Sequence, residues 1–226
     1  MTNQYADLLH TFVHEFQTPI ANIRMAADIL ASPVARAEPG RSEKYLQIIR
    51  EETERLQQQV ETVLSLARAE QNALIVCLDA VDVHDLIESV AQRHGLYLTL
   101  DLQAPQPTIL ADRHHLTNVL YNLLDNAVKY SPDLPHITIQ TALDTDNNLI
   151  ISVIDQGVGI SEIAQTQIFQ PYFRVQSRDA MNVKGFGLGL SYVQKIVEAH
   201  GWTISVVSAI GQGSEFRITS PALRRS

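Results

Sequence analysis

Residues 122–130 read Asn-Leu-Leu-Asp-Asn-Ala-Val-Lys-Tyr (NLLDNAVKY) and end a predicted helix over 115–130. Steps of three and four residues place four polar side chains on one stripe of that helix, Asn122, Asn126, Lys129 and Tyr130. An Asn amide oxygen is a hard ligand suited to Mg²⁺, and the Lys129 ammonium can pair with phosphate. The stripe predicts a site for a metal-bound polyphosphate, with an ordinary solvated helix face as the alternative.

Two glycine-rich motifs follow this helix. Residues 155–160 (DQGVGI) come directly after the apolar run LIISVI, so a strand delivers Asp155 into a turn where glycines allow a close approach to a flat ligand. Residues 185–190 (GFGLGL) lead into a predicted helix over 190–200, whose first amides favour an anion. The second motif lacks the strand–turn–helix context of a dinucleotide fold, and the first could equally be a tight turn.

The first third of the chain predicts a helical hairpin. Apolar residues repeat at alternating steps of three and four in two segments, 9–30 and 46–67, and the stretch 32–41 between them contains prolines and a glycine. A lone hairpin buries too little apolar surface to be stable. We therefore expect it to dimerise into a four-helix bundle.

His14 lies off the apolar stripe of the first helix. Thr18 is four residues further on and shares its face, while Pro19 removes the amide that would bond the carbonyl of Glu15. The helix should therefore bend one turn past His14. An exposed histidine beside a carboxylate is a candidate nucleophile, although an ordinary surface histidine fits the same pattern.

The pattern after residue 70 is typical of an α+β fold, a mixed sheet under helices. We expect helices over 83–94, 115–130 and 190–200, the first two capped by Asp82 and Asp112, and a loop-rich stretch over 155–189. The expected strands cover 74–78, 96–102, 137–143, 149–154, 202–208 and 214–219. The domain boundary should fall near 71–76.

Composition limits the class of protein. The 226 residues carry 17 Lys and Arg against 25 Asp and Glu, a net charge of −8, which argues against general binding to nucleic acid or anionic membranes. The single cysteine, Cys77, excludes an internal disulfide. No stretch approaches the roughly 20 apolar residues of a membrane span. The sequence predicts a soluble, cytoplasmic protein and leaves open a sensor or membrane anchor outside these residues.

The order and spacing of the motifs carry more information than any motif alone. His-Glu-x-x-Thr-Pro from His14, then NLLDNAVKY, DQGVGI, FQPYF and GFGLGL, resembles the sensor histidine kinases of two-component systems along the whole chain. The resemblance implies a dimerisation and histidine phosphotransfer domain over 1–71. It also implies a catalytic ATP-binding domain of the Bergerat type, an α/β sandwich, over 72–226.

The resemblance assigns roles to individual residues. His14 corresponds to the phosphoacceptor, Glu15 to its acidic neighbour, and Thr18 has the spacing of family members that also dephosphorylate their regulator. Asn126 corresponds to the Mg²⁺ ligand and Asp155 to the carboxylate that accepts from the adenine amino group. The other expected ATP-binding residues are Asn122, Lys129, Tyr130, Gly157, Gly159, Arg174, Lys184, Gly185, Gly187, Gly189 and Ser214. Gln17 departs from the family, which usually has Arg there.

The implied function is autophosphorylation of His14 by ATP and Mg²⁺ in a homodimer. The phosphoryl group would then pass to an aspartate on a response regulator. An ATP hydrolase of the same superfold is the first alternative, but such enzymes have a Glu at the position of Asn122 to activate water. A non-catalytic scaffold is the second, although the intact Asn126, Asp155 and glycines argue against it.

Overall fold

The computed structural model describes residues 2–32, 40–70, 74–94, 98–131, 135–175 and 187–221. The chain divides into two compact units, and the division along the chain falls between Leu64 and Ser65. None of the helices in the described ranges is long and apolar enough to cross a membrane.

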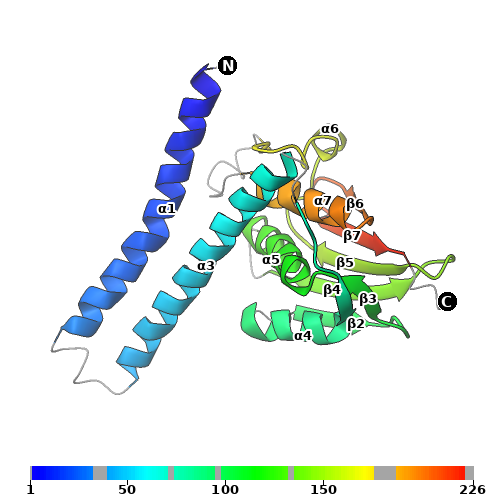
Figure 1. The fold of residues 1–226 in the computed structure, drawn as a ribbon, viewed down its shortest axis with the longest axis horizontal. Helices are drawn as coiled ribbons and strands as arrows, with labels where there is room; N and C mark the ends of the chain where they lie inside the picture. The colour runs from blue at the N-terminus through cyan, green and yellow to red at the C-terminus, as the bar shows by residue number, and fades with distance from the viewer. Residues whose placement is uncertain are drawn as a thin grey trace. The chain divides into compact units, whose positions relative to one another are not determined.

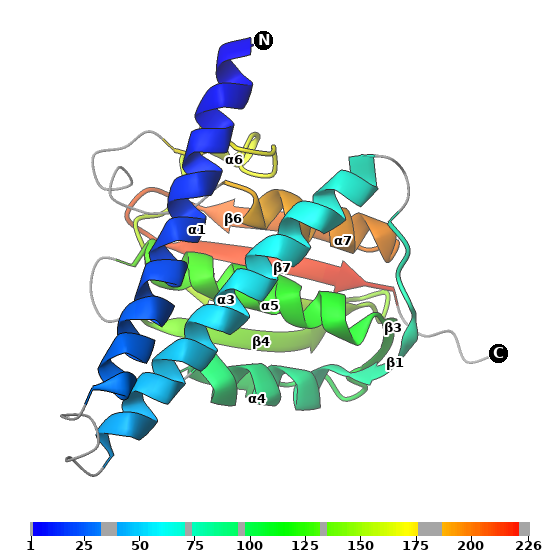
Figure 2. The same ribbon diagram turned by 60° about the vertical axis from the view of Figure 1, so that its left-hand side comes forward.

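The first unit is a pair of long helices, α1 (Thr2–Ala31) and α3 (Arg41–Glu70), the latter continuing into the second unit. They lie close together at the end of α1 and the start of α3 and diverge from there (Figures 1 and 2). Asn22 Nδ2 on α1 donates a 2.7 Å hydrogen bond to Glu52 Oε1 on α3. Pro19 lies inside α1 and is buried. Five large apolar side chains on these helices stay 44–56% exposed, Ile20, Met25, Leu46, Val60 and Leu64.

The second unit is built on a five-stranded mixed sheet with the strand order β2-β4-β5-β7-β6. Strand β2 is parallel to β4, and all other neighbours are antiparallel. The strands are β2 (Leu98–Leu102), β4 (Ile137–Leu143), β5 (Leu149–Asp155), β6 (Thr203–Ser208) and β7 (Ser214–Ser220). A second sheet pairs β1 (Asp79–Asp82) antiparallel with β3 (Thr108–Ala111).

Three helices cover one face of the large sheet: α4 (Val83–His94), α5 (Arg113–Lys129) and α7 (Gly189–Ala199) (Figure 2). A short helix, α6 (Glu162–Gln165), follows β5. The apolar sides of α5 and α7 meet the alternate inward residues of β4, β5 and β7 in one core, in which Leu120, Ile151 and Tyr192 are almost fully buried. The α+β prediction, with a helical N-terminal part and a mixed sheet under helices, is confirmed.

Local signals set the element boundaries closely in most places. Asp82 Oδ1 accepts from the amides of His84 and Asp85, and Asp112 Oδ1 accepts from the amide of His115, so both predicted helix caps are present. The helices α4, α5 and α7 and all five strands of the large sheet begin and end within about two residues of their predicted bounds. Helices α1 and α3 extend several residues beyond the apolar repeats over 9–30 and 46–67.

One predicted strand is wrong, and two elements were not predicted. Residues 74–78 form no strand, because the Cys77 amide donates to Asp112 Oδ2 (3.0 Å) rather than to a neighbouring strand. The strand begins at Asp79 instead. Helix α6 lies in the stretch 155–189 that was predicted to be rich in loops, and strand β3 lies in a stretch for which no element was predicted. Strand β3 pairs with a segment about 30 residues earlier, and α6 is a single turn, so neither leaves a periodic pattern.

Candidate functional site

The carboxylate of Asp155 lies at the end of β5 and is 6% exposed. Its Oδ1 accepts hydrogen bonds from the amides of Gly157 (2.8 Å) and Ser214 (3.2 Å). Both hydrogen bonds from the described residues go to Oδ1, so Oδ2 is available to a donor on a ligand. Burial raises the pKa of Asp155 above its usual value, and the two amide bonds oppose that change.

The turn after Asp155 is held against the end of α5. The amide of Val158 donates to the carbonyl of Tyr130 (3.1 Å), and a Cβ on Gly157 would lie 2.5 Å from that same carbonyl oxygen. Only a glycine permits this approach. The DQGVGI turn therefore joins the carboxylate to the C-terminal end of the polar helix α5.

The same turn is held on its other side by the β6–β7 hairpin. Gly159 has a φ of +69°, and a Cβ there would overlap the carbonyl oxygen of Ala209. The amide of Gly211 donates to the carbonyl of Val158 (2.8 Å). Gly213, with a φ of +78°, lies against the Asp155 carbonyl in the same way. These close backbone contacts fix the wall of the site.

A pocket opens beside Asp155 within the second unit. Six residues expected at the nucleotide site line it: Asn126, Tyr130, Asp155, Gly159, Arg174 and Ser214. The rest of its wall is apolar and is formed by Val158, Ile160, Ile168, Phe173, Val175, Leu190 and Phe216. An apolar slot with a few polar groups suits a flat, largely apolar ring that carries hydrogen-bond donors.

Asn126 and Tyr130 contribute the α5 side of the pocket. Among the described residues none hydrogen-bonds the side-chain amide of Asn126, so its oxygen is available to a metal ion. Burial raises the pKa of the Tyr130 hydroxyl, and the nearby positive charge of Arg174 opposes this change. Tyr130 therefore stays neutral at physiological pH.

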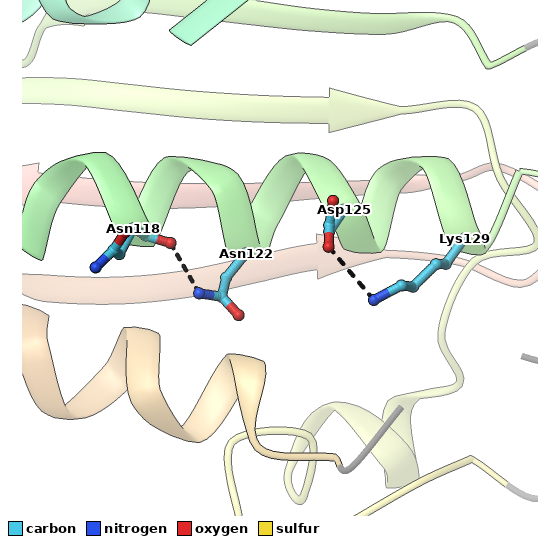
Figure 3. A network of polar contacts seen from close by, with 4 residues as sticks. All are labelled: Asn118, Asn122, Asp125 and Lys129. Carbon is cyan, nitrogen blue, oxygen red and sulfur yellow. Dashed lines mark hydrogen bonds and ion pairs between the residues drawn. The ribbon is translucent and has the colours of Figure 1, made fainter. Parts of the chain in front are cut away.

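Asn122 and Lys129 do not line the pocket itself. Asn122 Nδ2 donates to the carbonyl of Asn118 (2.8 Å), and Lys129 Nζ forms an ion pair with Asp125 (3.5 Å) (Figure 3). The Asn122 side chain reaches the start of α7, since a Cβ on Gly189 would lie 2.7 Å from Asn122 Oδ1. The polar stripe of α5 thus meets the glycine motif at the N-terminus of α7.

The remaining predicted residues are placed only in part. Gly187 has a φ of +66°, and its carbonyl accepts from the amide of Tyr172 (2.9 Å). Lys184 and Gly185 lie outside the described residues, as does the polar stretch 176–186 as a whole. His14, Glu15 and Thr18 lie on α1, and the structure describes the side chain of Thr18, which is half-buried, but not those of His14 and Glu15.

Sequence reasoning missed most of the apolar wall of the pocket. Val158, Ile160, Phe173 and Leu190 lie within the quoted motifs, but no contact with a ligand was predicted for their side chains. Ile168, Val175 and Phe216 lie outside those motifs. Ser208 was also missed. Its hydroxyl lies 3.0 Å from that of Ser214 and binds the Ile160 amide, a contact between residues 48 positions apart that no local pattern indicates.

Comparison with known proteins agrees with this geometry. Residues 111–224 match the family of histidine kinase-, DNA gyrase B-, and HSP90-like ATPases, and residues 4–72 match the His Kinase A (phospho-acceptor) domain. The chain belongs to the sensor histidine kinases of two-component systems. In this histidine kinase, the range matched to the ATPase family contains the pocket around Asp155, and the range matched to the phospho-acceptor domain contains His14.

Curated relatives cover almost all of this chain. It is 34% identical to the sensor protein RprX of Bacteroides fragilis over 99% of this chain and 45% of the relative. It is 29% identical to the adaptive-response sensory kinase SasA of Synechocystis, over 98% of this chain and 60% of the relative. The chain thus spans about half the length of these relatives.

Solved structures share the arrangement of elements. Full-length ShkA in complex with AMPPNP matches 95% of this chain and 45% of its own, with 27% identity and a TM-score of 0.63. The histidine kinase ThkA in complex with the response regulator protein TrrA matches 97% of this chain and 63% of its own, with 22% identity and a TM-score of 0.58. The second likeness shows the fold alone.

Proposed function

We propose that this chain is the core of an ATP-dependent protein-histidine kinase. It binds ATP in the pocket beside Asp155, transfers the γ-phosphoryl group to His14, and passes it on to an aspartate of a response regulator. The observation that carries the proposal is the buried Asp155 carboxylate, whose Oδ2 is available in an apolar pocket bordered by Asn126. The match of residues 4–72 to a phospho-acceptor domain supplies the second substrate.

The proposal divides the chain into a dimerisation and phosphotransfer domain over 1–71 and a catalytic domain over 72–226. Dimerisation of the first domain is supported by the exposed apolar side chains on α1 and α3, among them Ile20, Met25 and Val60, which are 46–56% exposed in the single chain. Large apolar side chains exposed along a helix pair are typical of an interface. A second copy of the hairpin would cover it in a four-helix bundle.

Recognition of ATP rests on the described pocket. Asp155 Oδ2 would accept from the adenine amino group while the apolar wall covers the ring. Bound Mg²⁺ would neutralise charge on the phosphates, and the Asn126 amide oxygen is a suitable ligand for it. Asn122 and Lys129, which lie before and after Asn126 on α5, and Arg174, which lines the pocket, would face the phosphates. Gly185, Gly187 and Gly189, with Lys184, would close the phosphate end.

The transfer itself is an in-line displacement. A free ring nitrogen of His14 attacks the γ-phosphorus, an N–P bond forms, and the bond to the oxygen bridging the β- and γ-phosphates breaks, so that ADP leaves. Glu15 would hold the imidazole tautomer and accept its proton. In the second step the N–P bond breaks as a carboxylate of the regulator attacks. Catalysis is then mainly positioning and charge neutralisation.

The two alternatives differ from this proposal in the products they predict. An ATP hydrolase of the same fold needs a carboxylate to activate water, and α5 has Asn122 at that position, with its Nδ2 bonded to the carbonyl of Asn118. A non-catalytic scaffold would have no need of the open Oδ2 of Asp155. Phosphoryl transfer to a protein nucleophile fits both observations.

The test combines labelled ATP with two variants. Wild-type protein should incorporate γ-phosphate into an acid-labile, alkali-stable product. His14→Ala should abolish incorporation and leave ATP affinity nearly unchanged. Asp155→Ala should weaken ATP binding at least several-fold, because an unpaired adenine donor costs roughly 1–3 kcal/mol. Histidine phosphorylation that persists in His14→Ala, or wild-type ATP affinity in Asp155→Ala, would contradict the assignment.

A further inference from the structure

Ser208, the last residue of β6, connects the walls of the pocket. Its hydroxyl donates to the carbonyl of Gly213 (2.7 Å), accepts from the amide of Ile160 (2.8 Å), and lies 3.0 Å from the hydroxyl of Ser214. Gln165 supports this arrangement, since its Nε2 donates to the carbonyls of Ile160 and Ser208, both at 2.8 Å. Ser208 thus has a fixed hydrogen-bond partner on each side.

The number of protons on these groups fixes the direction of the bond to Ser214. A serine hydroxyl has one proton and two lone pairs. The proton of Ser208 goes to the Gly213 carbonyl, which can only accept, and one lone pair takes the Ile160 amide, which can only donate. Ser208 can therefore meet Ser214 only as an acceptor. Ser214 must be the donor, and its own hydroxyl has only lone pairs left for the pocket.

Asp155 presents the same polarity. Its Oδ1 accepts from the amides of Gly157 and Ser214, and an ionised carboxylate has no proton to donate. Asp155 and Ser214 both line the pocket and are both largely buried, at 6% and 7% exposure. The two polar groups at this end of the pocket are therefore both acceptors, and a ligand needs donors to satisfy them.

We propose that Ser208 is a specificity-determining residue for the nucleotide base, acting through Ser214. Ser208 accepts the hydrogen bond of the Ser214 hydroxyl, so that neither Ser214 nor Asp155 can donate a hydrogen bond into the pocket. The site therefore binds a purine with a 6-amino group and rejects one with a 6-oxo group. A carbonyl oxygen placed against two acceptors would lose its hydrogen bond and be repelled. The inference rests on the proposed binding of ATP.

The test compares the affinities for ATP and inosine triphosphate, which differ in the 6-substituent and the adjacent ring nitrogen. Calorimetry on the full chain gives both dissociation constants and their ratio. Ser208→Ala frees the Ser214 proton to donate into the pocket, so the preference for ATP should fall by roughly 3- to 10-fold, the scale of one neutral hydrogen bond. Ser208→Thr keeps a hydroxyl and should restore the preference.

Ser205→Ala is the matched control, because Ser205 is an exposed serine on the same strand and does not line the pocket. It should leave both affinities unchanged. If Ser208→Ala does not fold, Ser214→Ala supplies the measurement, since it removes the acceptor itself while keeping the amide bond to Asp155. The preference of Ser214→Ala for ATP over inosine triphosphate should fall by the same factor as that expected for Ser208→Ala.

The outcomes separate this inference from the proposed function. An unchanged ratio of affinities in a folded Ser208→Ala or Ser214→Ala protein overturns the role of Ser208 and leaves ATP binding intact. A wild-type protein that binds neither nucleotide contradicts the proposed function, and the inference falls with it. A weaker affinity for both nucleotides with an unchanged ratio means that Ser208 is merely structural, which also overturns the inference.

Discussion

The backbone amide of Asp112 donates a 2.9 Å hydrogen bond to Nε2 of His200, 88 residues further along the chain. The other ring nitrogen, Nδ1, lies 2.7 Å from the carbonyl of Ile196, which can only accept. His200 must therefore be neutral, with its proton on Nδ1. Because Asp112 also caps α5 and bonds the Cys77 amide, this contact joins the end of α7 to the start of α5.

The first prediction concerns pH. Burial lowers the pKa of His200 below its usual value, against smaller raising effects of the Ile196 carbonyl and the Asp112 charge. The unfolded chain then binds more protons, so the free energy of unfolding should fall as the pH drops below about 6.5. The expected decrease is about 1 kcal/mol, the contribution of one hydrogen bond, because a protonated Nε2 can no longer accept from the Asp112 amide. Urea unfolding at several pH values measures it.

His200→Gln separates this contribution from the other titrating groups. A glutamine oxygen can accept from the Asp112 amide at any pH, so the variant should lose part of the pH dependence between about 5 and 7. The lowered pKa values of Asp144, through hydrogen bonds from Asn148, and of Glu215, through its bond from Arg217, act only at more acidic pH. An identical pH profile in the variant would show that His200 does not titrate on unfolding.

The second prediction uses two glycines near the pocket. Gly159 and Gly211 both have positive φ, +69° and +76°, but a Cβ on Gly159 would overlap the Ala209 carbonyl whereas one on Gly211 meets nothing within 4 Å. Gly211→Ala should cost only the left-handed strain, about 1–2 kcal/mol. Gly159→Ala should lose more than about 3 kcal/mol in urea unfolding, because the backbone must also move. An equal decrease in the free energy of unfolding for both variants would mean that the backbone at Gly159 can move at little cost.

Local signals explain which parts of this structure could be predicted. Helix α5 carries its own cap at Asp112, and β5 is an apolar run that ends in a glycine turn, so both appear in the sequence with close bounds. The apolar run 74–78 was wrongly predicted to be a strand, because the Cys77 amide bonds to Asp112, 35 residues further along the chain, and a local pattern does not show this contact. The Lys129–Asp125 pair and the Ser208 contacts likewise depend on the choice among several partners, which the sequence leaves open.

The third prediction concerns dimerisation. Leu56 is half-buried and Val60 is 46% exposed in the single chain. Both belong to the apolar repeat at steps of three and four over 46–67, which forms the heptad seam of α3. Replacing both with Glu would place charges inside the expected bundle, so light scattering should show monomers or an unfolded hairpin. Gln57→Glu adds a charge at an exposed position off the seam and should leave the dimer intact. A well-folded dimer of the double variant would refute the heptad interpretation.

The last prediction is that Thr18 serves removal of phosphate from the regulator. Thr18 lies one helical turn beyond His14 on α1, on the same face, so its hydroxyl can lie near a phosphoryl group that faces His14. During dephosphorylation that group is on the regulator's aspartate and the attacking group is water. A hydroxyl can orient this water by hydrogen bonding without being consumed.

Thr18→Ala should keep autophosphorylation within a few-fold and slow the loss of phosphate from the cognate regulator about tenfold, a barrier increase of roughly 1–2 kcal/mol. Thr18→Ser retains the hydroxyl and should behave like the wild type in both assays. The competing explanation is that Thr18 only leads into Pro19 and supports the helix at that point. In that case both rates should fall together in Thr18→Ala, because a distorted helix would misplace His14 for either reaction. Two unchanged rates would mean that the core acts as a kinase alone.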